Sequence, residues 1–228
     1  GDDEPGRRLT ELVRAEKVMA RLHRDRTIET TVKLRVVGPP RQQLLRIDFE
    51  TEPSYEILRS KLADYAKRVA ACDVVVLSDY GKGGLTHIGR MIALANRYRK
   101  PVLIDPKGSD FARYSGATII TPNLNEFRAV AGAWKTEREF GERAQSLRRK
   151  LKAQALLVTR GADGMTLFER GRRLHVPAQA REVSDVSGAG DTVIATLAVM
   201  LGSGRAFEDS VRLANRAAGI VVGKFGTA

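Results

Sequence analysis

The segment Val74-Val75-Val76-Leu77-Ser78-Asp79 is an apolar run that ends in two polar residues, and it decides the fold class. Runs of the same kind follow at residues 102–104, 117–121 and 155–158, and apolar residues recur at helical spacing over 88–98 and 140–151. Short apolar runs are typical of strands buried on both faces of a parallel sheet, which amphipathic helices cover. We therefore predict an α/β fold, a mostly parallel sheet flanked by helices, from residue 71 onward.

Residues 1–70 follow a different pattern. Val32, Leu34 and Val36 alternate with charged residues, the segment 38–40 (Gly-Pro-Pro) breaks the run, and residues 43–49 form a second strand-like stretch. This alternation predicts a small antiparallel β-hairpin at about residues 30–50 with one wet face. The domain boundary is therefore expected between residues 70 and 71, with an N-terminal region before it and an α/β core over 71–228.

The composition restricts the class of partner. The chain of 228 residues has 39 Lys and Arg against 27 Asp and Glu, a formal charge of +12 that favours anionic ligands. Aromatic residues make up only 6% and the arginines are scattered, so no nucleic-acid surface is predicted. Without an apolar run of about 18 residues or the apolar core of a secretion signal, we expect a cytoplasmic protein that does not bind membranes.

Two strand ends carry an acid and a lysine. Asp79 and Lys82 follow the first apolar run, and Asp105 and Lys107 follow the second. Loops after parallel strands meet at one edge of the sheet, and lysine is suited to phosphate oxygens. These four residues are candidates for phosphate or substrate contacts. The alternative, in which they only turn the chain, remains open.

The third strand end reads Thr121-Pro122-Asn123-Leu124-Asn125-Glu126 before a helical run. Taken alone, it favours a capping box in which Asn123 and Glu126 satisfy the first turn of the helix. The functional alternative is that both organise water and Mg²⁺ near phosphates, because magnesium prefers oxygen ligands and keeps several waters.

The fourth strand end, Thr159-Arg160-Gly161-Ala162-Asp163-Gly164, leads into the run 165–168. Its glycines are compatible with any connection between strands, so by itself it is a weak indication of a nucleotide loop. The chain has no G-x-x-x-x-G-K-[ST] run, and no G-x-G-x-x-G follows a strand, so Walker-type and dinucleotide sites have little support.

The strongest local signal is Asp185-Val186-Ser187-Gly188-Ala189-Gly190-Asp191-Thr192, which runs into an apolar helix at 193–201. Small residues let backbone amides converge at a helix N-terminus, which favours a phosphoryl group. Asp191 is then placed to take a proton from a hydroxyl that attacks the phosphorus. The alternative is a glycine-rich turn with an ordinary first-turn acid.

Together these motifs resemble the signatures of the PfkB, or ribokinase-like, carbohydrate kinases. The segment 185–192 is similar to the family's D-T-x-G-A-G-D signature, with serine at position 187 where threonine is common. The resemblance implies that Asp191 is the catalytic base and that Gly188, Ala189 and Gly190 form the anion hole. It also implies that Asn123 and Glu126 match the N-x-x-E element near Mg²⁺, and that Thr159, Gly161 and Gly164 belong to the nucleotide loop.

Within the family, the sequence is most similar to heptose-7-phosphate kinases of lipopolysaccharide core synthesis. The similarity lies in segments 31–36, 42–50, 78–83 and 103–108. It implies transfer from ATP to D-glycero-D-manno-heptose 7-phosphate, giving the 1,7-bisphosphate. It also implies a hairpin that covers the sugar and forms a homodimer. Other substrates of the family (fructose phosphate, ribose or a nucleoside) and a non-catalytic basic binding protein remain alternatives.

The resemblance is incomplete at the ends of the sequence. These kinases normally begin with further strands and a Gly-Gly sugar-binding motif, so we expect the sequence to be part of a longer chain. The full set of sugar contacts, the anomer preference and a second enzymatic domain are therefore left open. The need for a monovalent cation near Lys224 to Thr227 is left open as well.

Overall fold

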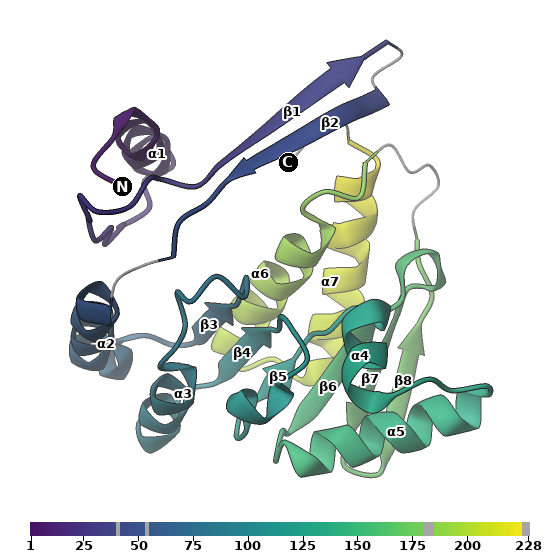
Figure 1. Cartoon of the computed structure of the whole chain (residues 1–228). Helices are drawn as coiled ribbons and strands as arrows, with labels where there is room; N and C mark the ends of the chain where they lie inside the picture. Colours follow the sequence, from purple (N-terminus) through teal and green to yellow (C-terminus); the bar gives the residue numbers. More distant parts are fainter. Residues whose placement is uncertain (40–41, 53–54, 180–184, 225–228) are drawn as a thin grey trace. The chain divides into compact units, whose positions relative to one another are not determined.

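The computed structural model describes residues 1–39, 42–52, 55–179 and 185–224. These residues form two compact units, one of residues 1–63 and 82–86, the other of residues 64–81 and 87–228. Figure 1 shows the helices and strands of both units with their labels.

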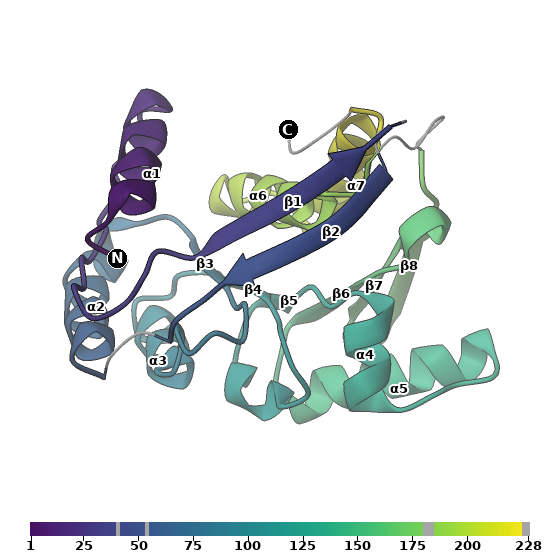
Figure 2. The same ribbon diagram turned by 45° about the horizontal axis from the view of Figure 1, so that its top comes forward.

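The first unit contains α1 (Glu4–Ala15), a hairpin of β1 (Val32–Gly38) and β2 (Gln42–Phe49), and the first part of α2 (Tyr55–Arg68). Figure 2 shows the two strands along their length. They pair antiparallel, with Leu34 opposite Ile47 and Lys33 opposite Asp48, and the register shifts between Val36 and Val37. The predicted hairpin is confirmed.

The two faces of the hairpin differ in chemistry because side chains alternate along each strand. On one face, Lys33 lies 3.3 Å from Glu50 and 3.5 Å from Asp48, and Lys82 also pairs with Glu50. The opposite face, which we call the apolar face of the hairpin, consists of Val32, Leu34, Val36, Leu45, Ile47 and Phe49. Most of its side chains are exposed, for example Leu45 at 52%.

The second unit is built on a six-stranded sheet in the order β3-β4-β5-β6-β7-β8. Its first four strands pair parallel, and β6, β7 and β8 pair antiparallel. The strands are β3 (Val75–Ser78), β4 (Val102–Asp105), β5 (Ile119–Ile120), β6 (Ala155–Thr159), β7 (Met165–Glu169) and β8 (Arg172–Val176). The mostly parallel sheet predicted from the apolar runs is confirmed.

The helices of this unit are α3 (Ile88–Arg97), α4 (Leu124–Ala131), α5 (Glu137–Lys150), α6 (Ala189–Gly202) and α7 (Phe207–Val222). Short 3₁₀ turns are η1 (Val69–Ala71), η2 (Phe111–Tyr114) and η3 (Gly161–Asp163). A buried cluster joins sheet residues such as Leu103, Ile119 and Leu157 to Leu197 and Val211 of α6 and α7. Because these apolar side chains fix the sheet against α6, the strand ends are held rigidly beside the start of that helix.

In the described part of the chain, no helix is both long enough and apolar enough to cross a membrane.

Candidate active site

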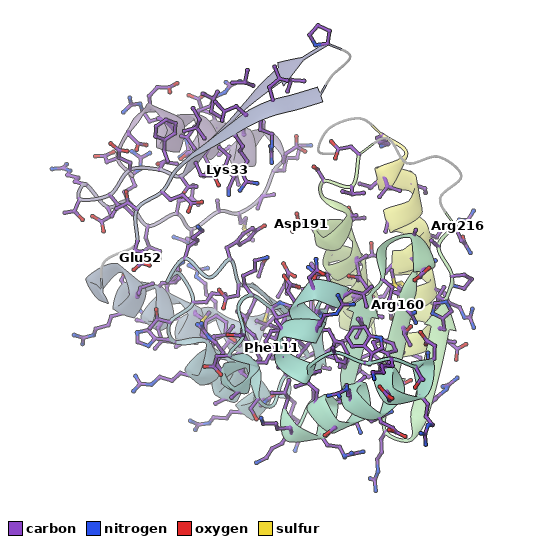
Figure 3. The ribbon with its side chains drawn as sticks, turned by 45° about the vertical axis from the view of Figure 1, so that its right-hand side comes forward. Lys33, Glu52, Phe111, Arg160, Asp191 and Arg216 are labelled. Carbon is purple, nitrogen blue, oxygen red and sulfur yellow. The ribbon has the colours of Figure 1, made fainter. Side chains whose placement is uncertain are left out.

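Helix α6 begins at a glycine. Its N-cap is Gly188, which has a φ of +80° and provides no side-chain cap. A positive φ favours glycine because it carries no Cβ. Asp191 lies in the first turn of α6 and is exposed (Figure 3). The helix therefore starts earlier than the predicted run at 193–201. Asp191 consequently lies beside the backbone amides at the start of the helix.

The loop before α6 is held by its own hydrogen bonds. The Asp185 carboxylate accepts a bond from the Ser187 amide at 2.8 Å, and the Ala189 amide donates to the Val186 carbonyl at 3.3 Å. Of the predicted anion-hole residues, Ala189 therefore has an internal partner for its amide. Backbone N–H groups at the start of a helix otherwise lack acceptors within the helix.

Asp191 lines a cavity of about 230 Å³. The residues around it are Tyr80, Asp105, Lys107, Thr121, Asn123, Glu126, Thr159, Gly190, Asp191 and Val193. They come from the ends of β3, β4, β5 and β6 and from the start of α6. The structure thus brings together, around one small cavity, the predicted residues Asp105, Lys107, Asn123, Glu126, Thr159 and Asp191.

Asn123 and Glu126 form the capping box expected at the start of α4. The Asn123 side-chain oxygen accepts bonds from the amides of Asn125 and Glu126, both at 2.9 Å. One Glu126 carboxylate oxygen accepts the Asn123 amide at 3.0 Å, and the other lies 3.0 Å from the Lys107 ammonium. The capping interpretation is confirmed. A role of both residues toward nucleotide or Mg²⁺ stays a prediction.

Asp105 is the most perturbed acid of this cavity. Partial burial raises its pKa to about 6, the Ser78 hydroxyl at 3.2 Å opposes the rise, and the charges of Glu126 and Asp191 add to it. The cavity therefore carries several carboxylates against a single lysine among its lining residues. Such a site favours a ligand that brings its own cation.

A second, more apolar cavity of about 310 Å³ shares Thr159, Gly190 and Val193 with the first. Gly161 and Gly164 line it, and their role in a nucleotide loop stays a prediction. Gly164 has a φ of +84°, and an added Cβ would lie 2.1 Å from the Val176 carbonyl oxygen. An apolar cavity that adjoins a polar one suits a ligand with a flat apolar end and a charged end.

The far wall of the second cavity was not predicted from the sequence. That wall includes Ala178, Asn215, Ala218, Gly219 and Val222. Asn215 is buried, and its side chain donates to the Pro177 carbonyl at 2.8 Å. The run of small residues at 217–219, late in an amphipathic helix, was the available signal.

The remaining candidates lie elsewhere. Asp79 is 4% exposed, and its carboxylate oxygens accept bonds from the Gly81 amide and the Tyr114 hydroxyl, each at 2.9 Å. Lys82 belongs to the first unit, where it pairs with Glu50. Neither residue lines the cavity of Asp191, whereas Asp105 and Lys107 do. A role of Asp79 and Lys82 in binding ligand stays a prediction.

Comparison with curated proteins gives close relatives. The chain is 52% identical over 227 residues to a D-beta-D-heptose 7-phosphate kinase of Bordetella bronchiseptica, covering 100% of this chain and 72% of that protein. It is 50% identical over 236 residues to the bifunctional protein HldE of Halorhodospira halophila, again over the whole chain. The chain spans 48% of that relative's length.

Solved structures share the fold. Phosphofructokinase-2 from Escherichia coli, in complex with potassium, superposes with a TM-score of 0.83 at 17% identity, covering 97% of this chain and 74% of the other. The sequence also matches the pfkB family carbohydrate kinases over residues 1–228. The fold and the motifs around Asp191 agree with that match, and the chain belongs to the PfkB family of carbohydrate kinases.

Proposed function

We propose that the protein is an ATP-dependent kinase that phosphorylates D-glycero-β-D-manno-heptose 7-phosphate at the 1-position to give the 1,7-bisphosphate. The substrate assignment is supported by the 52% identity to a protein named as a heptose 7-phosphate kinase. The reaction type is supported by one observation above all: an exposed carboxylate, Asp191, lies at the uncapped start of α6 in a cavity that adjoins an apolar one.

In this proposal Asp191 accepts the proton of the anomeric hydroxyl while that oxygen attacks the terminal phosphorus of ATP. The amide end of α6, from Gly188 to Asp191, holds the transferring group, and the apolar cavity holds the base of the nucleotide. Catalysis then rests on positioning and on neutralising charge, as is usual for phosphoryl transfer.

Mg²⁺ is the cofactor that we expect with ATP. Within the described residues, no group of three His, Cys, Asp or Glu side chains forms a metal site. Both carboxylate oxygens of Glu126 already have partners. The residues therefore fit an ion that arrives with the nucleotide phosphates and reaches Asn123 and Glu126 through water, which is the usual behaviour of magnesium. When bound, the ion would neutralise phosphate charge.

We further propose that the hairpin covers the sugar and joins two copies of the chain in a homodimer. The support is the exposed apolar face of the hairpin, since a two-stranded ribbon without a covered face is marginally stable. Light scattering should give the mass of a dimer, and Ile47→Lys on that face should give a monomer. A monomeric unmodified protein would contradict the proposal.

We also propose that the reaction takes place in the cytoplasm. A cytoplasmic kinase would supply heptose bisphosphate for ADP-heptose and the lipopolysaccharide core. Because a relative is named as a bifunctional protein, we also expect a second enzymatic domain in the intact protein. Of the segment considered for a monovalent cation, Lys224 to Thr227, only Lys224 is among the described residues.

The test is ATP consumption by the full-length protein with Mg²⁺ against heptose 7-phosphate, fructose 6-phosphate, fructose 1-phosphate, ribose and adenosine. Fast turnover on the heptose phosphate alone is the expected result. Turnover on a hexose phosphate, ribose or adenosine would keep the kinase and change the substrate. No turnover on any of them would favour a non-catalytic binding protein.

A further inference from the structure

Asp79 and Tyr114 form a buried polar cluster beside the cavity of Asp191. Tyr114 in η2 is fully buried, and its hydroxyl lies 2.9 Å from an Asp79 carboxylate oxygen and 3.0 Å from the Lys107 carbonyl oxygen. The Lys107 amide donates to the same hydroxyl at 3.1 Å. The Tyr114 oxygen therefore accepts a bond from the Lys107 amide and lies within hydrogen-bonding distance of the Lys107 carbonyl.

The hydroxyl keeps its proton. Burial raises the pKa of Tyr114 far above its ordinary value, and the hydrogen bond to Asp79 raises it further. The hydroxyl can donate one bond, and an ionised carboxylate is a stronger acceptor than a carbonyl. The Arg113 guanidinium lies 3.6 Å from the same Asp79 carboxylate oxygen and forms an ion pair with it. The cluster is thus charged and bonded in the interior, where removing one partner is costly.

The loop after β3 supports Lys107 from a second direction. The Asp79 amide donates to the Asp105 carbonyl at 2.9 Å, and its carboxylate accepts the Gly81 amide at 2.9 Å. Gly81 has a φ of +68°, and a Cβ there would lie 3.4 Å from Cγ of Lys107. The stem of Lys107 therefore passes close to the Gly81 backbone, which Asp79 holds in place.

Lys107 connects this cluster to the cavity, because its backbone amide bonds to Tyr114 and the residue lines the cavity. Its ammonium lies 3.0 Å from Glu126, and it is the only cation among the described residues that line the cavity, beside the carboxylates of Asp105, Glu126 and Asp191. An anionic phosphate in that cavity depends on where this one positive charge lies.

We infer that Asp79 and Tyr114 are positioning residues that fix Lys107 against a phosphate group held beside Asp191. This inference rests on the proposed function for the identity of that phosphate, on ATP or on the sugar. It differs from the sequence-based expectation for Asp79, because the carboxylate acts through Tyr114 and Lys107 without touching the ligand.

The experiment is a double-mutant cycle in the full-length protein with Tyr114→Phe, Lys107→Met and both together. Tyr114→Phe and Lys107→Met should each lower kcat/KM by about tenfold, and the double variant should be little worse than either one, because residues that act as a unit are not additive. The substrate whose KM rises identifies the phosphate. Assays are run well below each variant's Tm.

Tyr65→Phe is the matched control. Tyr65 is half-buried, and its hydroxyl donates to the Met91 carbonyl at 2.9 Å, but Tyr65 does not line the cavity. It should lower the Tm and leave kcat/KM unchanged. Losses that multiply in the cycle, or an equal loss in Tyr65→Phe, would overturn the inference. If Tyr114→Phe fails to fold, Asp79→Asn replaces it in the same cycle.

A binding arm separates this inference from the proposed function. The affinities for a non-hydrolysable ATP analogue with Mg²⁺ and for heptose 7-phosphate are measured by calorimetry for all variants. If the unmodified protein phosphorylates no sugar, the proposed function fails, and the binding cycle alone decides the inference. Equal affinity of the unmodified protein, Tyr114→Phe and Lys107→Met for the ATP analogue and for heptose 7-phosphate would then overturn it, and a shared, non-additive loss for either ligand would support it.

Discussion

The hairpin and the α/β unit use the same kinds of apolar residue in opposite ways. In the α/β unit, Leu157 and its neighbours between the sheet and α6 are completely buried. In the hairpin, Leu45 and Ile47 are exposed on the apolar face, and on the charged face Lys33 forms an ion pair with Glu50. The first arrangement makes a rigid frame for ligand groups, and the second is suited to binding another surface.

The candidate ligand-binding residues and the exposed apolar surface of the hairpin thus belong to different units of this protein. The cavity of Asp191 is lined wholly by residues of the α/β unit. We propose that the hairpin contributes surface for association.

Asp191→Asn should break catalysis without affecting the fold. Removing a general base costs on the order of 10² to 10⁴ in rate, so kcat should fall by that factor while nucleotide affinity is kept. Asp209→Asn is the control, since Asp209 is another exposed acid in the first turn of a helix, α7. Normal turnover by Asp191→Asn would contradict the assignment of Asp191 as the base and of this cavity as the active site.

Leu157→Ala and Leu45→Ala compare the two regions directly. The buried substitution should cost about 2 to 5 kcal/mol of unfolding free energy, because it leaves a cavity in the core. The exposed one should stay within about 0.5 kcal/mol when measured at protein concentrations too low for association. Urea denaturation followed by circular dichroism gives both values. A large loss in Leu45→Ala would mean that the hairpin has a covered core of its own.

Gly164→Ala tests whether the α/β unit is packed tightly around its ligand loops. The new Cβ would meet backbone atoms of Val176 and Ala178 at 2.1 and 2.5 Å, at a φ of +84°. We expect a loss of about 3 kcal/mol and weaker nucleotide binding. Gly161→Ala, where φ is +60° and nothing lies within 4 Å, should cost only about 1 kcal/mol. Equal losses in both variants would contradict the packing argument.

Asp105→Asn should show a smaller effect that depends on pH. The folded-state pKa of Asp105 is about 6 against an ordinary value of 3.8, so the native protein binds more protons than the unfolded chain between these values. The stability contributed by Asp105 therefore falls as pH rises through that window. Relative to the unmodified protein, the variant should gain stability from about pH 4 to 6, measured by urea denaturation without Mg²⁺. A difference in stability between the variant and the unmodified protein that does not change with pH would contradict this prediction.

Much of the fold follows from local sequence. The alternation of apolar runs and amphipathic segments predicted the sheet, because each strand of a parallel sheet is buried along its own length. The loops after β4, β5 and β6 and the start of α6 converge on one cavity for the same reason: parallel strands end at a common edge.

The rest depends on distant partners. Asp79 and Asp105 look alike in sequence, each an acid after a buried strand, yet Asp79 bonds to Tyr114, 35 residues away. Asn215 and Ala178 line the apolar cavity only because α7 packs against β7 and β8. No local pattern encodes such pairings, so the buried state of Asp79 could not be predicted, and the small residues at 217–219 indicated a close approach without identifying the cavity that they line.

The uncapped start of α6 has a consequence for the stability of the free enzyme. Most helices satisfy their first amides with a serine, threonine or aspartate side chain, but the residue before α6 is a glycine in the left-handed region. A bound phosphoryl group would serve as the missing cap, so ligand affinity and helix stability would be one quantity measured in two ways. The first turn of α6 should fray in the free protein, and its amide hydrogens should exchange with solvent more slowly once nucleotide is bound.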